Sequence, residues 1–312
     1  MNQLNTIYRK RWLINRKELE DKKLRVFPLN EGTKIPKHDP IGILIKLLGF
    51  ILKLTGLFHL GKKNTEKITL TENKVKSPKL SMNKITLLHL SDLHIGEGPV
   101  DIERIIQAIK ECSSYHFAVI TGDLFSKLPN SEDEFILNKL LKSLNPVIDT
   151  LCVLGNHDSY KIVPRLEKLG VKVLTNQIVY YPKSEKLPYE LEVIGTDDPH
   201  YFFQKDALRI LQEGNPDRYR ISLVHSPELY DAAEKYNIDL YLCGHTHGGQ
   251  IALPGGFAPL KRVYRGKKYY KGSWIYKNLS GYTSSGVGTS GIPVRFFTTA
   301  EITLHCLSGP KG

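Results

Sequence analysis

Residues 85–94 read ITLLHLSDLH, an apolar run of strand length that ends in Asp92 and His94, two side chains suited to binding a metal ion. Four later apolar runs are also followed by Asp, Asn or His, at residues 117–121, 150–154, 221–224 and 240–243. Helical patterns separate several of these runs, at residues 101–112, at 131–144 behind a capping box that begins at Ser131, and at 164–169. This alternation predicts an α/β protein.

The polar residues that follow these runs form one candidate site. In open α/β sheets, ligands bind beyond the carboxyl ends of the strands, so these side chains are expected to converge. The candidates are Asp92, His94, Asp123, Asn156, His225, His245 and His247. These donors exceed the needs of one zinc ion, whereas two ions that share one carboxylate would use them all. Mixed oxygen and imidazole donors favour Mn, Fe, Zn or Co over Ca or Mg.

The order of the motifs resembles that of a known family. The segments are SDLH (91–94), GDLF (122–125), GNHD (155–158), a single His225 after a strand, and GHTHGGQ (244–250). Together they resemble the motif set of the calcineurin-like metallophosphoesterase superfamily, over residues 85–251. The resemblance implies two packed mixed β-sheets flanked by helices. It also implies hydrolysis of phosphate esters with two divalent cations, Mn first among them, that clamp the oxygens of a phosphoryl displacement.

The resemblance also implies a role for each residue. One ion would be held by Asp92, His94, Asp123 and His247. The other would be held by Asp123, Asn156, His225 and His245, so that Asp123 bridges the two. His157 would face the scissile phosphate, where it would stabilise charge or protonate the leaving oxygen. Asp158 would orient His157.

The basic charge of the chain lies outside the part that carries the motifs. The net charge is +12. Residues 1–80 contain 18 Lys or Arg against 7 Asp or Glu, whereas residues 81–312 contain 26 against 25. A nucleic-acid-binding enzyme would be expected to carry its basic footprint on the folded body. The distribution therefore argues against nucleic acid as a partner.

Residues 1–82 are expected to form a basic extension, and residues 83–312 the metallophosphoesterase domain. The extension is expected to hold a helix at 7–25, an amphipathic helix at 41–60 and a Lys-rich linker at 61–82. In the amphipathic helix, Lys46, Lys53 and three glycines share one narrow face. This pattern predicts a peripheral helix in the headgroup region of an anionic membrane, at the cytoplasmic face of the inner membrane. The alternative is a helix packed on the catalytic domain or on a partner.

The substrate is suggested by two further stretches. Residues 261–271 interleave six cations with three tyrosines, and Lys261, Arg262, Arg265 and Lys267 are candidate substrate contacts; a solvated basic loop is the alternative. The run GVGTSGIPVRFF (286–297) resembles the end of a membrane-associated bacterial subgroup of the superfamily. One member class of that subgroup cleaves UDP-2,3-diacylglucosamine to 2,3-diacylglucosamine 1-phosphate and UMP in lipid A synthesis. This acylated sugar nucleotide is the leading specific hypothesis.

Other functions remain open from the sequence. A generic phosphodiesterase or phosphatase would share the site without a lipid requirement. A nuclease would want a basic body, and a non-catalytic metal-binding scaffold would be expected to have lost ligands. The oligomeric state is likewise open.

Several residues outside the motifs carry simpler expectations. Tyr201, Phe202 and Phe203 are predicted to form an exposed loop that lines an acyl-chain groove together with the 41–60 helix; the alternative is that they pack as core, as aromatic clusters more often do. Cys152 and Cys243 lie in apolar runs and are expected to pack as buried thiols in a reducing compartment. The structural histidines are expected to include His89 and His116, and no role is assigned to His38, His59, His200 and His305.

Overall fold

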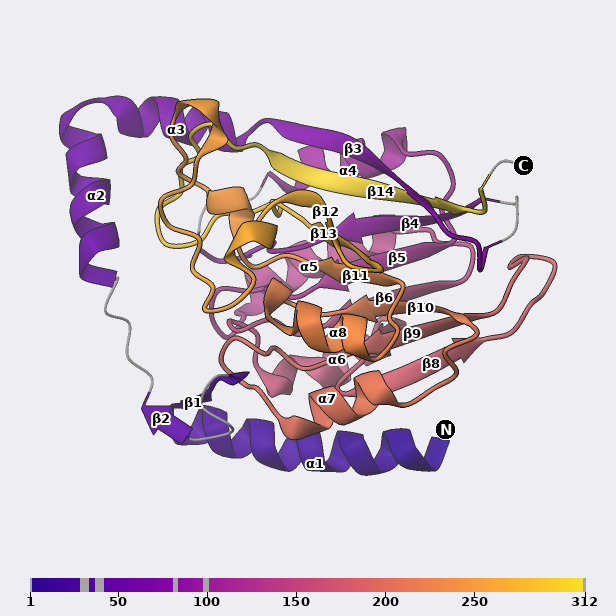
Figure 1. Ribbon diagram of the computed structural model, residues 1–312. Helices are drawn as coiled ribbons and strands as arrows, with labels where there is room; N and C mark the ends of the chain where they lie inside the picture. Colours follow the sequence, from indigo (N-terminus) through magenta and orange to yellow (C-terminus); the bar gives the residue numbers. More distant parts are fainter. Residues whose placement is uncertain (1, 29–33, 37–41, 81–83, 98–100, 311–312) are drawn as a thin grey trace.

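The protein is two six-stranded β-sheets packed face to face, with helices on their outer sides (Figure 1). The computed structural model describes residues 2–28, 34–36, 42–80, 84–97 and 101–310. The expected fold, two mixed sheets flanked by helices, is confirmed.

The first sheet has the strand order β3-β14-β4-β5-β6-β7. Its strands are β3 (Ile68–Lys76), β4 (Ile85–Leu90), β5 (Phe117–Thr121), β6 (Asp149–Val153), β7 (Val171–Val173) and β14 (Ala300–Ser308). The four strands from β4 to β7 are parallel, whereas β14 pairs antiparallel with β4 and parallel with β3. The carboxyl ends of β4, β5 and β6 therefore meet at one edge.

The second sheet has the order β12-β13-β11-β10-β9-β8. Its strands are β8 (Gln177–Tyr181), β9 (Leu191–Gly195), β10 (Tyr219–Leu223), β11 (Leu240–Cys243), β12 (Gly272–Tyr276) and β13 (Leu279–Thr283). The strands β9, β10, β11 and β13 are parallel, and β8 and β12 are antiparallel edges. The strand ends after β10 and β11 thus also share an edge.

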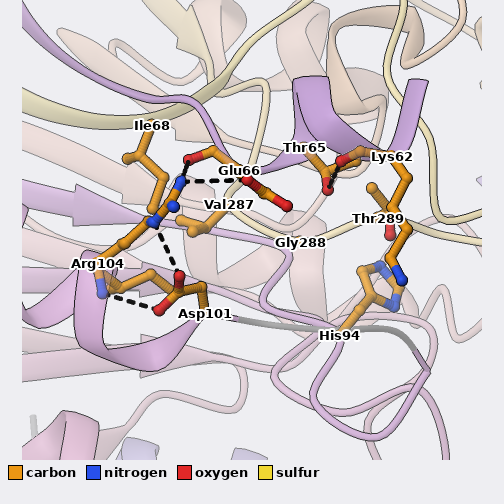
Figure 2. Close-up of a pocket in the computed structure, with 11 residues that line it drawn as sticks. Lys62, Thr65, Glu66, Ile68, His94, Asp101, Arg104, Val287, Gly288 and Thr289 are labelled. Carbon is orange, nitrogen blue, oxygen red and sulfur yellow. Dashed lines mark hydrogen bonds and ion pairs between the residues drawn. The ribbon is translucent and has the colours of Figure 1, made fainter. Parts of the chain in front are cut away.

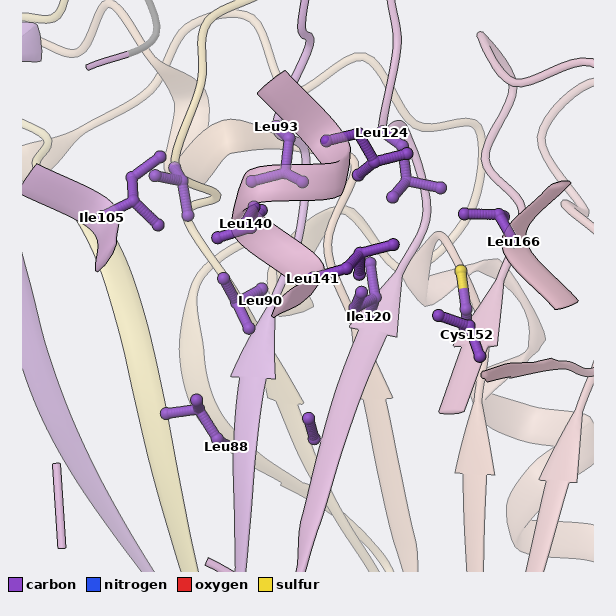
Figure 3. Packing of buried hydrophobic residues seen from close by; sticks show 14 of the residues in the cluster. Leu88, Leu90, Leu93, Ile105, Ile120, Leu124, Leu140, Leu141, Cys152 and Leu166 are labelled. Carbon is purple, nitrogen blue, oxygen red and sulfur yellow. The ribbon is translucent and has the colours of Figure 1, made fainter. Parts of the chain in front are cut away.

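The apolar runs form strands because both faces of each sheet are covered. Along β4, Leu87 packs toward the second sheet, whereas Leu88 and Leu90 pack against the outer helices (Figure 3). Side chains alternate between the two faces of a strand, so a strand buried on both faces reads as one continuous apolar run. The helices of the body are α4 (Ile102–Glu111), α5 (Ser131–Ser143), α6 (Val163–Lys168), α7 (Lys205–Gln212) and α8 (Tyr230–Lys235).

The capping box of α5 begins one residue earlier than expected. Asn130, rather than Ser131, is the N-cap, and its side-chain oxygen accepts the backbone N–H groups of Glu132 and Asp133 at 2.9 Å each. Asp133 completes the box by accepting the N–H of Asn130 at 3.1 Å. Asn is as good an N-cap as Ser, so composition alone did not separate the two positions.

The N-terminal segment differs most from expectation. The first helix, α1 (Asn2–Asp21), ends before the predicted Arg25, and the next residues form β1 (Leu24–Val26), which pairs with β2 (Lys34–Pro36). The predicted helix at 41–60 is two helices, α2 (Gly42–Leu54) and α3 (Leu57–Thr65), bent by 108°. Gly56 lies between them with φ 74°, a conformation that stops a right-handed helix and suits glycine.

The predicted linker at 61–82 is wrong over most of its length. Residues 61–65 complete α3, and β3 joins the first sheet along nine residue pairs with β14. Residues 81–83 lie outside the described residues. Among the described residues, no single helix is long and apolar enough to cross a membrane, and only α2 and α3 taken together meet the length and composition criteria.

The predicted aromatic loop is also wrong. Tyr201, Phe202 and Phe203 are buried, at 6–7% exposure, in a cluster that includes residues of α1. They pack as core, and they do not line the cavity described below. All four cysteines are free, and Cys152 and Cys243 are buried among apolar neighbours as expected.

Candidate metal centre

The seven candidate ligands meet where the strand ends of both sheets face each other. Asp92 and His94 follow β4, Asp123 follows β5, and Asn156 follows β6. His225 follows β10, and His245 and His247 follow β11. Backbone hydrogen bonds join adjacent strand ends, from Asp92 N–H to Gly122 O at 3.0 Å and from Gly244 N–H to His225 O at 2.8 Å. All seven side chains belong to residues that are at most 8% exposed.

One group of donor atoms comprises Asp92, His94 and His247. The Nε2 atoms of His94 and His247 are 3.2 Å apart, and His247 Nε2 is 3.5 Å from Asp92 Oδ1. His94 Nε2 also lies 3.4 Å from Asp123 Oδ2. Three imidazole or carboxylate donors and a fourth from Asp123 therefore surround one point.

A second group lies on the other side of Asp123. His225 Nε2 is 3.2 Å from Asp123 Oδ2, 3.1 Å from Asn156 Oδ1 and 3.1 Å from His245 Nδ1. Asp123 Oδ2 thus faces both groups, while its Oδ1 accepts the backbone N–H of His157 at 2.8 Å. This is the geometry expected of a bridging carboxylate.

Hydrogen bonds to the far sides of the rings determine what these nitrogens present to the centre. His225 Nδ1 lies 2.7 Å from the carbonyl of Thr121, and His245 Nε2 lies 2.9 Å from the carbonyl of Arg262. A carbonyl only accepts, so each of these nitrogens carries the proton when its ring is neutral. The nitrogens that face each other across the site then present lone pairs.

His94 is oriented in the same way by a longer relay. The Ser126 hydroxyl donates to Glu97 Oε2 at 2.6 Å, so its oxygen accepts from His94 Nδ1 at 2.8 Å. His94 Nε2 therefore also presents a lone pair to the centre. His247 Nδ1 is buried without a hydrogen-bond partner among the described residues.

These lone pairs and carboxylates fit cations. Acceptor atoms at 3.1–3.5 Å from one another with no proton between them repel unless a positive charge lies among them. Such donors, held by carbonyl and hydroxyl partners on their far sides, are typical of a protein metal site. The residues present therefore fit two divalent cations that share Asp123.

The pKa values agree with this charge pattern. Burial lowers the pKa of His94 to about 3 and those of His245 and His247 well below their ordinary value, so these rings are neutral and able to coordinate. Burial also lowers the pKa of His225, but the charge of Asp123 outweighs this effect and the pKa lies well above its ordinary value. Asp123 thus attracts a positive charge to this point, either a proton on His225 Nε2 or a bound cation, and the ring presents a lone pair only in the second case.

The backbone at the site is strained. Asp92, His94, Asp123, His245 and His247 all have positive φ, between 47° and 72°. Residues other than glycine rarely adopt this region, and such conformations cluster at functional sites where the surrounding structure enforces them. These left-handed residues occur at the ends of β4, β5 and β11, whereas Asn156 and His225 are not among the residues with positive φ.

Two glycines make room for the carboxylates. A Cβ on Gly155 would lie 2.1 Å from Asp123 Oδ1, and one on Gly244 would lie 2.2 Å from Asp92 Oδ2. Both contacts are too short for any side chain. The glycine in each motif therefore allows the close approach of a neighbouring ligand.

His157 and Asp158 are placed differently from each other. His157 Nδ1 lies 3.4 Å from Ser126 O, and the ring packs edge-on against His94 at the mouth of the site. The Asp158 carboxylate accepts the backbone N–H groups of Gly155 at 2.9 Å and Phe125 at 3.2 Å. It therefore holds the turn around Asn156 rather than the ring of His157, which corrects the expected orienting contact.

The four candidate substrate contacts in the basic stretch after the last motif lie in different surroundings. Arg262 lines the cavity above the centre and presents its carbonyl to His245. Arg265 pairs with Asp231, and Lys261 lies 4.3 Å over the ring of Tyr270. Lys267 is exposed in a short 3-10 turn, Lys267–Tyr269, away from the residues that line the cavity. Arg262 alone of the four candidates reaches the cavity.

Two residues next to the candidate ligands, His200 and Arg295, were not predicted from the sequence to lie there. The ring of His200 packs at a tilt of 46° against that of His245, with centroids 4.2 Å apart, and its Nδ1 lies 3.1 Å from Glu228 Oε2, a fully buried carboxylate. The signal was present, because residues 196–200, TDDPH, follow the apolar β9. Arg295 is fully buried and donates to the carbonyls of His247, Ser285, Gly286, Gly288 and Thr299, behind the site.

His89 and His116 have the structural roles expected of them. His89 bonds to His305 at 3.1 Å and to Thr121 at 2.8 Å, and His116 lies 3.1 Å from the backbone N–H of Thr86. His59 is exposed on α3, and His38 lies outside the described residues.

A cavity of about 540 Å³ opens above the metal centre. Its polar floor includes Asp123, Asn156, His157, His245 and His247. Its apolar wall is formed by Leu44, Ile45, Leu47, Leu48 and Ile51 of α2 and by Leu253, Pro259, Leu260 and Ile292 of the body. The helix is held to the body by an apolar cluster of Leu52, Ile292 and Val294.

A second cavity, of about 420 Å³, is lined in part by His94 (Figure 2). Lys62, Thr65 and Glu66 at the end of α3 line it together with Arg104 of α4, and Glu66 lies directly beside Arg104. Arg104 donates to the Asp101 carboxylate at 2.9 Å and to the Glu66 carbonyl at 2.8 Å. Its charge therefore joins the end of α3 to α4.

Known proteins are similar to this chain in sequence. The sequence profile described as calcineurin-like phosphoesterase matches residues 85–249. An uncharacterized metallophosphoesterase of Aquifex aeolicus is 30% identical over 72% of this chain and 86% of its own length. The uncharacterized metallophosphoesterase YkuE of Bacillus subtilis is 29% identical over 77% of this chain and 85% of its own.

Among solved structures, TT1561 of Thermus thermophilus aligns with a TM-score of 0.45 and 12% identity, over 66% of this chain and 91% of its own. The profile match ends within the last motif of the metal centre and includes all seven candidate ligands. The chain therefore belongs to the calcineurin-like phosphoesterase family and is a metal-dependent phosphoester hydrolase.

Proposed function

We propose that the enzyme hydrolyses a phosphate ester or pyrophosphate bond of an acylated substrate at an anionic membrane surface. The observation that carries this proposal is the composition of the 540 Å³ cavity. One cavity joins candidate metal ligands on its floor to an apolar wall contributed by α2. An amphiphile with a phosphoryl group at one end and an acyl chain at the other matches both parts.

The residues of the floor would act on the phosphoryl group. Asp92, His94, Asp123 and His247 would hold one divalent cation, and Asp123, Asn156, His225 and His245 the other. Bound cations would supply Lewis-acid polarisation of the phosphoryl group and activation of water, with Mn²⁺ the first candidate. His157, half-buried at the mouth, would donate a hydrogen bond or a proton to the leaving oxygen. Asp158 would keep the turn that carries His157 in place.

The apolar wall favours a substrate with a hydrocarbon part. Leu44, Leu47 and Ile51 line the cavity and yet are 46–60% exposed. Removing apolar surface from water stabilises by about 0.8 kcal/mol per buried CH₂ group. An acyl chain along this wall would therefore contribute binding energy that a small polar phosphodiester lacks.

The surroundings of the cavity favour an anionic lipid surface as the partner. The docking patch consists of exposed apolar residues from two segments: Ile43, Leu44, Leu47, Phe50, Ile51, Leu54, Leu57 and Leu60 of α2 and α3, and Leu253, Phe257 and Leu260 of the body. Large exposed apolar patches mark interaction sites. Residues 42–65 and 251–271 contain ten Lys or Arg and no Asp or Glu. A second copy of this patch would be repelled, whereas anionic headgroups complement it.

The specific candidate is UDP-2,3-diacylglucosamine, cleaved to 2,3-diacylglucosamine 1-phosphate and UMP. It combines acyl chains, a pyrophosphate and a membrane location. The alternative is a generic phosphodiesterase or phosphatase that uses the same floor without the wall.

A single-turnover assay with Mn²⁺ tests the proposal. UDP-2,3-diacylglucosamine and bis-p-nitrophenyl phosphate are offered to the wild type and to Asp123→Ala. Release of UMP by the wild type alone supports both the floor and the acylated substrate. Cleavage of only the aryl diester keeps the site and discards the sugar nucleotide. Cleavage of neither contradicts the proposed phosphodiester chemistry.

Vesicle sedimentation tests the partner separately. We expect the wild type to sediment with phosphatidylglycerol-containing vesicles and not with pure phosphatidylcholine vesicles. Phe50→Glu, on the exposed patch and outside the cavity lining, should weaken this binding. Equal binding to neutral vesicles, or unchanged binding by Phe50→Glu, would contradict the proposed surface.

A further inference from the structure

The N-terminal helix α1 runs along the body beside α7 and β8 (Figure 1). It lies outside the matched family segment, which begins at residue 85. Yet it sends one arginine, Arg16, into the interior, where the residue is 0% exposed. A fully buried arginine is rare and requires several partners to compensate its charge.

The first set of partners belongs to the turn that carries Asn156 and His157. Arg16 Nη2 donates to the carbonyls of Gly155 at 3.0 Å and Asp158 at 2.5 Å. These two carbonyls lie immediately before and after the Asn156–His157 pair. The guanidinium therefore holds both ends of this turn through its carbonyls.

The second partner comes from the other sheet. Arg16 Nη1 lies 2.7 Å from Asp197 Oδ1, which follows β9. The guanidinium also lies 3.4 Å over the ring of Phe202. Because β6 and β9 belong to different sheets, Arg16 joins the two rims that together form the metal centre.

A second residue of α1 extends this contact. Glu20 accepts from Arg16 Nε at 2.8 Å, one helical turn away. It also accepts the backbone N–H of Tyr160 at 3.0 Å and the hydroxyl of Ser159 at 2.5 Å. Arg16 and Glu20 together thus bond to both ends of residues 155–160.

We propose that Arg16 is a positioning residue for the metal centre, acting through the Asn156–His157 turn. This inference rests on the proposed roles of Asn156 and His157. Without the guanidinium, two buried carbonyls lose a donor, the Asp197 carboxylate loses its charged partner and keeps Gln204 Nε2 at 3.3 Å as a side-chain donor, and the turn relaxes toward other partners. Asn156 then moves away from His225, which it now meets at 3.1 Å.

The expected effect is specific to one cation and to the chemical step. Loss of a residue that orients a ligand typically weakens metal binding by about 10–100-fold. A shift of roughly 1 Å at a catalytic group costs on the order of 10²-fold in rate. Arg16→Met should therefore weaken the cation site that contains Asn156 and lower kcat about 10²-fold, with KM for a small aryl diester nearly unchanged.

The test compares Arg16→Met and Arg16→Lys with Arg11→Met on the same helix. Arg11 bonds to Asp206 at 3.1 Å, and its side chain is 43% exposed, so it controls for loss of an α1 ion pair without contact to the turn. Full-length proteins are titrated with Mn²⁺ in competition with a chelating dye, and kcat and KM are measured on bis-p-nitrophenyl phosphate. Circular dichroism establishes that each variant is folded.

We expect one weakened Mn²⁺ site in Arg16→Met, a smaller loss in Arg16→Lys, and wild-type values in Arg11→Met. Folded Arg16→Met with wild-type Mn²⁺ affinities and kcat would overturn the proposal. If Arg16→Met does not fold, Arg16→Lys decides, because wild-type metal affinity in it would also overturn the proposal. A wild type that binds two Mn²⁺ ions but cleaves no phosphodiester would defeat the proposed function while the titration still tests Arg16.

Discussion

The strand ends that carry the candidate metal ligands, called the metal rim below, differ from helix α2 of the N-terminal segment in burial and in backbone conformation. Rim side chains follow buried strands such as β4, whose Leu87, Leu88 and Leu90 are 0% exposed, and their backbones are held in rare conformations. The α2 helix presents Leu44 at 60% and Leu54 at 72% exposure. The difference indicates that the rim supplies chemistry that tolerates little movement. Under the proposed function, α2 of the N-terminal segment would supply a surface for the substrate.

The largest effect is expected at the bridging carboxylate. Asp123→Asn removes the charge shared by both groups of donors, so turnover of bis-p-nitrophenyl phosphate should fall by at least about 10³-fold. Steady-state kinetics with Mn²⁺ measures this loss. Asp217→Asn, at an exposed position, is the matched control and should retain wild-type turnover. Activity of Asp123→Asn within tenfold of the wild type would contradict the bridging role.

A smaller effect should distinguish the two regions by how much free energy of unfolding is lost when a leucine is shortened to alanine. Leu90→Ala opens a cavity beneath α4 and α5 and should cost about 2–5 kcal/mol of the free energy of unfolding. Leu54→Ala, on the exposed face of α2, should change it by less than about 0.5 kcal/mol. Urea denaturation measures both. Similar costs for the two variants would show that α2 packs as core and that the comparison fails.

The wall of the cavity is expected to act on substrate choice alone. Leu47→Ser should raise KM for an acylated phosphodiester about 10-fold or more, since its hydrocarbon contact is lost, and should leave turnover of the aryl diester unchanged. The assay uses detergent-solubilised substrate, so that vesicle binding does not enter. Phe50→Ser, exposed but outside the cavity lining, is the control. An equal change in KM for both substrates would contradict the proposed role of the apolar wall in substrate choice.

A pH-dependent effect is expected in the core behind the rim. Burial lowers the pKa of His89 to about 3, below the value of about 6.5 in the unfolded chain. The unfolded state therefore takes up the proton first, and stability is lost as pH falls from 6.5 toward 3. At pH 5, protonation of His89 in the unfolded state lowers the free energy of unfolding by about 2 kcal/mol.

His89→Asn should accordingly show a shallower loss of stability between pH 7 and pH 5, measured by urea denaturation of metal-free protein. At pH 8 the difference between the two proteins reports only the packing lost with the ring. An unchanged pH slope would place the acid sensitivity in other groups.

The rim was predictable because its signals are local. Each ligand lies within four residues of a strand end, so short segments such as GNHD and GHTHGG carry the information. The N-terminal segment was not predictable in the same way. Gly56 has the seven-residue spacing of one helix face with Gly42 and Gly49, and nothing nearby distinguishes a packing glycine from a helix stop. The strand β3, ITLTENKVK, is rich in polar residues because it lies at a sheet edge.

Long-range contacts account for the remaining differences. Arg16 meets Asp158 across 142 positions in the chain, and Asn5 meets Ile178 across 173. No periodicity near residue 16 reveals such partners. Tyr201, Phe202 and Phe203 read as an exposed aromatic loop for the same reason, since α1 and β1 cover them from far upstream.

The number of bound metal ions tests the central claim most directly. Metal-free protein is reconstituted with Mn²⁺, freed of excess ion, and analysed by elemental mass spectrometry beside Asp123→Ala. The seven side chains predict two ions per wild-type chain and at most one in Asp123→Ala. A wild type that retains one ion or none, or an Asp123→Ala variant that retains two, would contradict a shared two-metal centre.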